Sequence, residues 1–146
     1  MPGNEFRFQQ VMNQGHSAAW EQLWDRAAAF YRMALDEFPD HPQALTSLGL
    51  ALYESMDYRE ALKYYLRAIE VTPNDPIPVE KAGELNERLN NLDQATILYL
   101  KAADLYARNR EVNRAIENWV RVTRLNPEHL LAHSRLALVY ERLGRN

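Results

Sequence analysis

The sequence predicts an all-α fold in which antiparallel helix pairs stack into an α-solenoid of about eight helices. Three observations predict it. Small and aromatic residues recur at a fixed step of 34 residues, apolar residues lie at helical spacings between them, and prolines fall where the helices would end. A fixed period of this length is typical of repeats that bury a core by stacking on their neighbours.

The segment 42–75 is the clearest repeat. Its spine is formed by Leu45, Leu48, Gly49, Leu52, Ala61, Tyr65, Ala68 and Pro73. One step back, the matching positions are Gly15, Ala27, Tyr31, Ala34 and Pro39, and one step forward they are Gly83, Ala95, Tyr99 and Ala102. We therefore predict repeats over about 8–41, 42–75 and 76–109.

The first repeat is predicted to hold one helix from Glu5 to about Trp20 and a second from Trp24 to about Glu37. A single helix from Ser17 to Glu37 is the alternative, because neither Gly nor Pro separates the two tryptophans. The repeat register favours a break between them.

In the second repeat, Pro42 suits the first turn of a helix because its missing N–H is not needed there. Asp57 and Glu60 have the spacing of a capping box, which would start the next helix near Tyr58. Pro73 is expected to end that helix.

The third repeat opens in the same way, with Asp75 as the expected N-cap before Pro76. It turns at Asn90 and Asn91 into a helix over about 93–108.

The period slips near residues 90–112. Ala107 stands where Pro is expected, and a second frame over 96–129 is formed by Tyr99, Ala102, Ala103, Tyr106, Ala115, Trp119, Val122 and Pro127. Either one helix serves two repeats, or one of the two matches is fortuitous. We expect an irregular superhelix in this region and antiparallel neighbours throughout.

A partial repeat over 130–146 follows, with Leu136, Ala137 and Tyr140 on its helix and Gly144 in the turn. Its apolar stripe lacks a partner helix, and solenoid ends normally carry a polar cap. We therefore expect that residues 1–146 form one domain at the N-terminal part of a longer protein. The alternative is that the chain covers this helix by forming a homo-oligomer.

The order of residue types in these columns resembles the tetratricopeptide repeat (TPR) family, and the resemblance extends from about Phe8 to the end of the chain. It implies a right-handed superhelix whose first helices line a concave groove for an extended peptide or a helix of another protein. Carried over column by column, the implied groove residues include Met12, His16, Trp20, Thr46, Leu50, Tyr53, Glu54, Glu80, Glu84 and Glu87.

This implied groove is apolar at one end and acidic in the middle. We expect its partner to place apolar anchors on Met12, Trp20, Leu50 and Tyr53 and basic residues on Glu54, Glu80, Glu84 and Glu87. For Trp20, packing inside the first repeat is the favoured alternative. Members of the family that clamp acidic chaperone tails carry Lys, Asn and Arg at five positions where this chain has Met12, His16, Ser47, Ile77 and Lys81, so that specificity is disfavoured.

The composition excludes several other functions. The chain has no cysteine, so disulfides and thiolate chemistry are excluded, and its formal net charge of −3 argues against a nucleic-acid partner. No apolar run approaches the roughly 18 residues that cross a membrane, and charges occupy the first ten residues, where a signal peptide would be apolar. We expect a cytoplasmic location and no membrane partner.

No residue pattern indicates catalysis. His129 and His133 lie at helical spacing, but the intervening residues lack the Glu of a zinc-protease helix and no third ligand is evident. A loop position explains His41 and His129 without a metal. We therefore expect no catalytic residue, no metal and no cofactor, and no enzymatic activity.

The predicted function is a non-catalytic scaffold that binds another protein in its groove. A self-association module is the alternative, indicated by the unpaired last helix. A helical-repeat RNA binder is less favoured, because of the net charge and the acidic groove.

Overall fold

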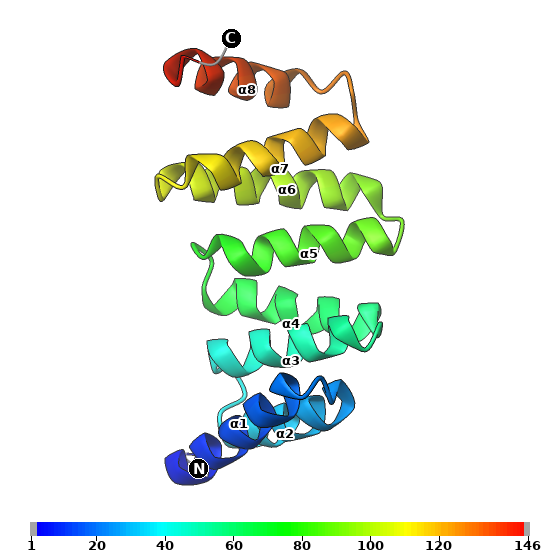
Figure 1. Ribbon diagram of the computed structural model, residues 1–146, viewed down its shortest axis with the longest axis vertical. Helices are drawn as coiled ribbons and strands as arrows, with labels where there is room; N and C mark the ends of the chain where they lie inside the picture. Colours follow the sequence, from blue (N-terminus) through cyan, green and yellow to red (C-terminus); the bar gives the residue numbers. More distant parts are fainter. Residues whose placement is uncertain (1–2, 145–146) are drawn as a thin grey trace. The chain divides into compact units, whose positions relative to one another are not determined.

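A computed structural model describes residues 3–144, and within this range the chain consists of helices joined by short turns and loops (Figure 1). The predicted all-α fold is confirmed. The helices are α1 (Glu5–Trp20), α2 (Trp24–Glu37), α3 (Pro42–Glu54), α4 (Tyr58–Val71), α5 (Pro76–Arg88), α6 (Leu92–Arg108), α7 (Val112–Leu125) and α8 (Leu130–Arg142). The predicted partial repeat over 130–146 ends outside the described residues, at 145–146, and residues 1–2 also lie outside them.

The helices group into two compact units. Unit 1, up to Pro73, holds α1–α4, and unit 2, from Asn74, holds α5–α8. In unit 1, α1 packs on α2, α2 on α3, and α3 on α4. In unit 2, α5 packs on α6, α6 on α7, and α7 on α8. Within each unit, every helix therefore packs mainly on its neighbours in the sequence.

The break between the two tryptophans of the first repeat is confirmed, and the single-helix alternative is wrong. The helix ends at Trp20 because Gln22 adopts a left-handed conformation, with φ of 61°. The N–H of Leu23 then donates back to Ala18 O at 2.9 Å. This is the hydrogen-bond pattern of a Schellman motif, which satisfies carbonyls at a helix end. The chain turns and restarts at Trp24 without either Gly or Pro.

The turn between α3 and α4 has the same form, and the capping box expected there is wrong. Met56 has φ of 65°, and the Asp57 N–H donates to Leu52 O at 2.9 Å. In a capping box that N–H would instead donate a hydrogen bond to the Glu60 carboxylate. The Asp57 N–H is already used in the bond to Leu52 O, and the Asp57 side chain makes no capping hydrogen bond. The predicted start of the helix at Tyr58 is nevertheless confirmed.

Two other predicted helix starts are confirmed, together with the residues expected to stabilise them. Pro42 occupies the first turn of α3, where no N–H is needed. Asp75 caps α5 by accepting a hydrogen bond from the Ile77 N–H at 3.0 Å, immediately before Pro76. Pro42 and Pro76 thus both lie in the first turn of a helix.

The glycine column lets each first helix approach the second helix of its own pair. Each glycine lies against the buried ring of the tyrosine 16 positions later in the sequence. A Cβ atom added to these glycines would lie 2.5 Å from Tyr31 at Gly15, 2.8 Å from Tyr65 at Gly49, and 2.9 Å from Tyr99 at Gly83. Real Cβ atoms do not pack this closely, so a larger residue would displace the ring.

Helix α6 has the contacts that a helix shared by two repeats requires. It packs on α5 as the second helix of one pair and on α7 as the first helix of the next. It also ends as α1, α3 and α5 do, with φ of 63° at Arg110 and the Glu111 N–H donating to Tyr106 O at 2.9 Å. The irregular region near 90–112 therefore contains two turns of one kind in succession, at Asn90 and at Arg110, with no proline loop between them.

Helix α8 is the least buried of the eight described helices. It packs on α7, and its buried residues are Ala132 and Leu136. Leu130 is 82% exposed, and Leu131, Leu138 and Leu143 are also exposed. Of the apolar residues predicted on this helix, Leu136 is buried and Tyr140 is half-buried, so the stripe expected to lack a partner helix is partly covered.

The glycine column yields a stability test. We expect Gly49→Leu to lower the free energy of unfolding by about 1 to 3 kcal/mol, because the new side chain would overlap the buried Tyr65 ring. Urea unfolding followed by circular dichroism measures the change. The matched control is Gln43→Leu, which introduces the same residue at an exposed position of α3. Equal stability of wild type and Gly49→Leu would show that the ring contact does not hold the helices together.

Candidate protein-binding surface

Two of the predicted groove residues in α1 differ from expectation in the exposure of their side chains. Met12 is only 1% exposed, because it lies on the same face of α1 as Phe8 and Gly15, which packs against α2. It is therefore not an exposed anchor. Trp20 is 89% exposed, so the favoured expectation that it packs inside the first repeat is wrong. It is the last residue of α1, where the Schellman turn leaves its side chain outside the core.

The remaining predicted residues of α1 and α3 are on or near the surface. His16 is exposed, and its Nδ1 lies 2.8 Å from the hydroxyl of Tyr31. Thr46 donates its hydroxyl to carbonyls of its own helix, so it offers a methyl group outward. Leu50 is 40% exposed, and Glu54 is exposed at the end of α3.

Tyr53 is half-buried beside a second aromatic residue. Its ring centroid lies 5.7 Å from that of Tyr58, at the start of α4, in an edge-on arrangement. Aromatic rings attract each other in this edge-to-face geometry. The turn between α3 and α4 therefore presents a fixed aromatic surface next to Glu54.

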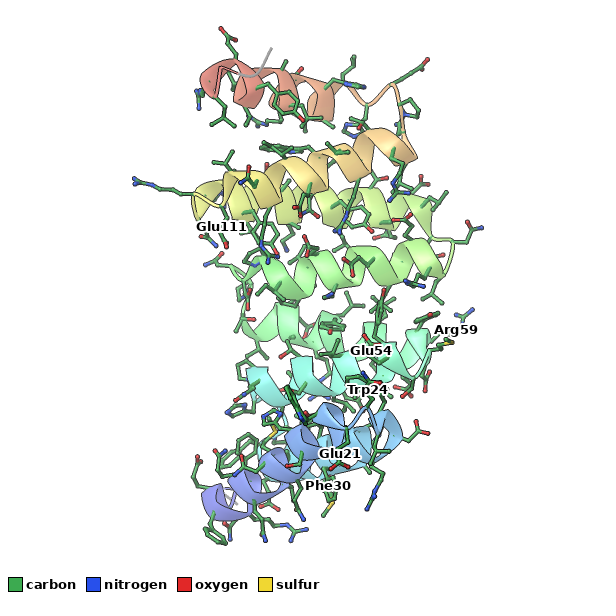
Figure 2. All side chains as sticks on the ribbon, in the orientation of Figure 1. Glu21, Trp24, Phe30, Glu54, Arg59 and Glu111 are labelled. Atoms are coloured by element: carbon green, nitrogen blue, oxygen red, sulfur yellow. The ribbon has the colours of Figure 1, made fainter. Side chains whose placement is uncertain are left out.

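The turn after α1 and the end of α3 share a surface depression of about 440 Å³ in unit 1. It is lined by Leu23, Trp24, Arg26 and Ser55, among others. The Ser55 hydroxyl donates to the Asp25 carboxylate at 3.2 Å, which ties the end of α3 to the start of α2. Figure 2 labels Glu21, Trp24 and Glu54, which belong to this part of the chain.

Leu23 and Trp24 also lie at the surface, although the repeat pattern does not assign them to the groove. The repeat frame placed Trp24 only at the start of a helix, because its column carries no groove residue in the family pattern. The sequence signal that could have indicated Trp24 is its spacing from Trp20, since the two tryptophans lie four residues apart and flank a helix break. Together with Trp20, Leu50, Tyr53 and Glu54, these two residues form what we call the α1/α3 surface.

The three predicted glutamates of α5 are engaged inside unit 2. Glu80 is only 6% exposed, and it accepts a hydrogen bond from Asn118 Nδ2 at 2.7 Å. Arg121 of α7 lies 3.5 Å from Glu80 and 3.3 Å from Glu84. Buried carboxylates need such partners, because an unpaired charge is costly to desolvate. Glu80 and Glu84 are therefore part of the contact between α5 and α7.

Glu87 has the most complete set of partners of the three. Its two carboxylate oxygens accept hydrogen bonds from Arg124 at 2.8 and 3.0 Å, and the Tyr99 hydroxyl donates to it at 2.8 Å. The Arg124 hydrogen bond holds the pKa of the Glu87 carboxyl below its usual range. Burial, together with the Glu87 carboxylate, raises the pKa of Tyr99 above its usual range, so this tyrosine remains a neutral donor.

The histidines take local structural positions. His129 is the N-cap of α8 and accepts a hydrogen bond from the Ala132 N–H at 3.2 Å, while His133 Nε2 lies 2.6 Å from Pro127 O. The loop position expected for His41 and His129 is thereby confirmed. Within residues 3–144, no group of three or more metal-ligating side chains is close enough to hold an ion. Nor does this range contain a helix with the length and apolar character needed to cross a bilayer.

The depressed pKa of Glu87 predicts a loss of stability in acid. A carboxyl whose pKa is lower in the folded chain stabilises it above the usual value of about 4.3, and this contribution disappears as the pH falls through the folded value. We expect Glu87→Gln to reduce stability at pH 7 by at most about 1 kcal/mol, because Arg124 remains half exposed to solvent.

Urea midpoints at pH 7 and pH 3.5 measure this effect, and the difference between wild type and Glu87→Gln should shrink at the lower pH. The matched control is Glu117→Gln on α7, which removes an exposed carboxylate. If the two glutamine variants respond alike to pH, the ion pair with Arg124 does not contribute to stability.

The sequence profile described as tetratricopeptide repeat matches residues 12–76, 46–107 and 100–146. Among curated proteins, the chain is similar to the inactive TPR repeat-containing thioredoxin TTL3 of Arabidopsis thaliana. The two are 29% identical over 105 residues, which cover 72% of this chain and 12% of that protein. The chain thus spans about an eighth of the length of this relative.

Solved structures support the same fold. PcrH from Pseudomonas aeruginosa has a TM-score of 0.74 at 20% identity, covering 84% of this chain and 93% of that one. The first TPR of Spaghetti (RPAP3), solved with an HSP90 peptide, has a TM-score of 0.63 at 15% identity, covering 99% and 98%. With the profile matching more than half of the sequence, the chain belongs to the tetratricopeptide repeat family.

Proposed function

We propose that this chain is a non-catalytic interaction module that binds a peptide or a helix of a partner protein on its α1/α3 surface. The main observation behind the proposal is the exposure of the Trp20 side chain to solvent at the end of α1. Trp is the residue type most enriched among those that dominate protein interfaces. An exposed indole of this kind therefore favours a surface that is covered by another molecule.

The charges around this surface favour a partner segment that carries basic residues. Glu54 is exposed at the end of α3, and Glu21 is exposed directly after Trp20. Arginines of α7 already pair with Glu80, Glu84 and Glu87. We therefore place the contacts of the partner's basic residues at Glu54 and Glu21 instead. A basic residue next to an apolar anchor is the partner chemistry that these groups fit.

Solved structures of the same fold support binding of a segment of another protein. PcrH has been solved with the chaperone binding region of PopD, and the first TPR of RPAP3 with an HSP90 peptide. These partners belong to those proteins. They support the general mode of binding proposed here and not a particular partner.

Single substitutions on the α1/α3 surface test the proposal. A peptide array that varies apolar anchors and flanking charges supplies a bound peptide, and fluorescence titration measures its Kd. We expect Trp20→Ala and Leu50→Ala each to weaken binding by about tenfold or more. The matched control is Leu66→Ala in α4, because Leu66 is 42% exposed and Leu50 is 40% exposed.

We expect the control to bind as the wild type does, and basic peptides to bind better than acidic ones. Peptides that bind all four proteins equally would contradict the use of this surface. Among peptides whose binding Trp20→Ala weakens, a preference for acidic ones would contradict the role of Glu54.

Self-association through α8 is a second candidate. The exposed apolar face of α8, with Leu130, Leu131 and Leu138, favours it, because a contiguous apolar surface is usually covered. Two copies that pair these faces would remove the leucines from water. This candidate is compatible with partner binding on the α1/α3 surface, which lies in the other unit.

Sedimentation equilibrium tests self-association. We expect the wild-type chain to form dimers as its concentration rises and the variant Leu131→Glu, which places a charge in the face, to remain monomeric. Arg135→Glu serves as the control, because it adds the same side chain at an exposed polar position of α8. A wild-type chain that remains monomeric at high concentration would exclude this function.

A further inference from the structure

Three cationic side chains surround one aromatic ring between α2 and α4. The charged groups of Arg32, Lys63 and Arg67 lie 5.6, 5.5 and 5.9 Å from the centre of the Tyr64 ring. Arg32 also donates from Nη1 to the Tyr64 hydroxyl at 2.9 Å, which fixes its position. Each cation is attracted by the ring, but the three repel one another. Such a cluster is stabilised by added negative charge.

Two of the three cations, Lys63 and Arg67, have a carboxylate partner, and in the described part of the chain the third, Arg32, does not. Arg67 lies 3.3 Å from Asp40 and donates to Pro39 O at 2.6 Å, and Lys63 lies 3.9 Å from Glu60. Within residues 3–144, Arg32 has no carboxylate at ion-pair distance, and its recorded hydrogen bond is to a neutral phenol. The guanidinium of Arg32 thus has N–H donors that can receive an anion.

The ring and two of the three cations, Arg32 and Arg67, line a depression of about 470 Å³ in the surface of unit 1, which we call the Tyr64 depression. Its lining is Arg32, Leu35, Asp36, Pro39, Tyr64 and Arg67. The arginines provide positive charge, while Leu35, Pro39 and the Tyr64 ring provide apolar walls. Asp36 is the carboxylate in this lining. A ligand that fits it has an anionic group next to an apolar group.

The repeat does not require this combination of residues. The position directly after the buried aromatic residue is Arg32 in α2, but the corresponding residues of α4, α6 and α7 are Leu66, Leu100 and Val120. The position directly before that residue is Tyr64 in α4, and it is Phe30, Leu98 and Asn118 in the other three. The repeat architecture is therefore built with other side chains at these places, and it does not explain the cluster.

We propose that the Tyr64 depression binds an acidic peptide segment of a partner protein. Arg32 receives a carboxylate of the segment, since guanidinium and carboxylate form short, paired hydrogen bonds. The adjoining apolar side chain rests on the Tyr64 ring and Leu35. A bare inorganic anion would leave these apolar walls uncovered, so a peptide fits the depression better. The site lies on α2 and α4, and it does not depend on the α1/α3 surface.

Nuclear magnetic resonance titration of the full chain tests this site. The probes are a capped peptide of alternating glutamate and leucine, its glutamine counterpart, and inorganic phosphate. We expect the glutamate peptide to shift the Arg32 side-chain resonance and Arg32→Gln to weaken its binding about tenfold. The matched control is Arg59→Gln in α4, because Arg59 is an exposed arginine (Figure 2) and is not one of the lining residues.

A second variant separates binding from folding. Tyr64→Phe keeps the ring and removes only the hydroxyl that holds Arg32, so we expect a several-fold weaker complex with an unchanged circular dichroism spectrum. Equal binding of the glutamate peptide to wild type and Arg32→Gln would overturn the proposal. Equal binding of the glutamine peptide would also overturn it. Phosphate that binds as tightly as the glutamate peptide would overturn the assignment of the ligand to a peptide.

Discussion

The structure depends on the contact between a small residue of one helix and an aromatic ring of the next. At Gly49 the Tyr65 ring lies where a Cβ atom would otherwise be, and the ring is buried. A glycine inside a helix costs about 1 kcal/mol relative to alanine, so the chain gives up helix stability for close approach. In return the ring is removed from water and fixes the separation of the two helices. The repeat period follows from this contact, because every helix pair needs it once.

The same contact accounts for the irregular part of unit 2. Helix α6 is long enough to carry Tyr99, which packs on Gly83, and also Ala103, which is fully buried one turn later. It can therefore act as the second helix of one pair and the first helix of another. Because no proline loop intervenes, α7 follows directly and brings Arg121 and Arg124 to the glutamates of α5. The ion pairs are thus a consequence of this double use of α6.

The sequence predicted the helices well and the exposure of individual side chains less well. Periodicity located the break before Trp24 and the proline starts, because these depend on residues close together in the chain. It did not place Met12 inside and Trp20 outside, since both belong to groove columns and their burial depends on how α1 rotates against α2. It also could not pair Glu80 with Arg121, because residues 41 positions apart meet only after α6 has set the position of α7.

Because each helix within a unit packs mainly on its sequence neighbours, most contacts of that unit lie within one helix or between adjacent helices. Proteins of such low contact order need little loop-closure entropy to reach their native topology, so this chain is expected to fold quickly and to begin at more than one hairpin. Within residues 3–144, α8 packs mainly on α7, and its buried residues are few. Amide hydrogen exchange would therefore reach α8 through fraying long before it reaches the tyrosine contacts of the interior.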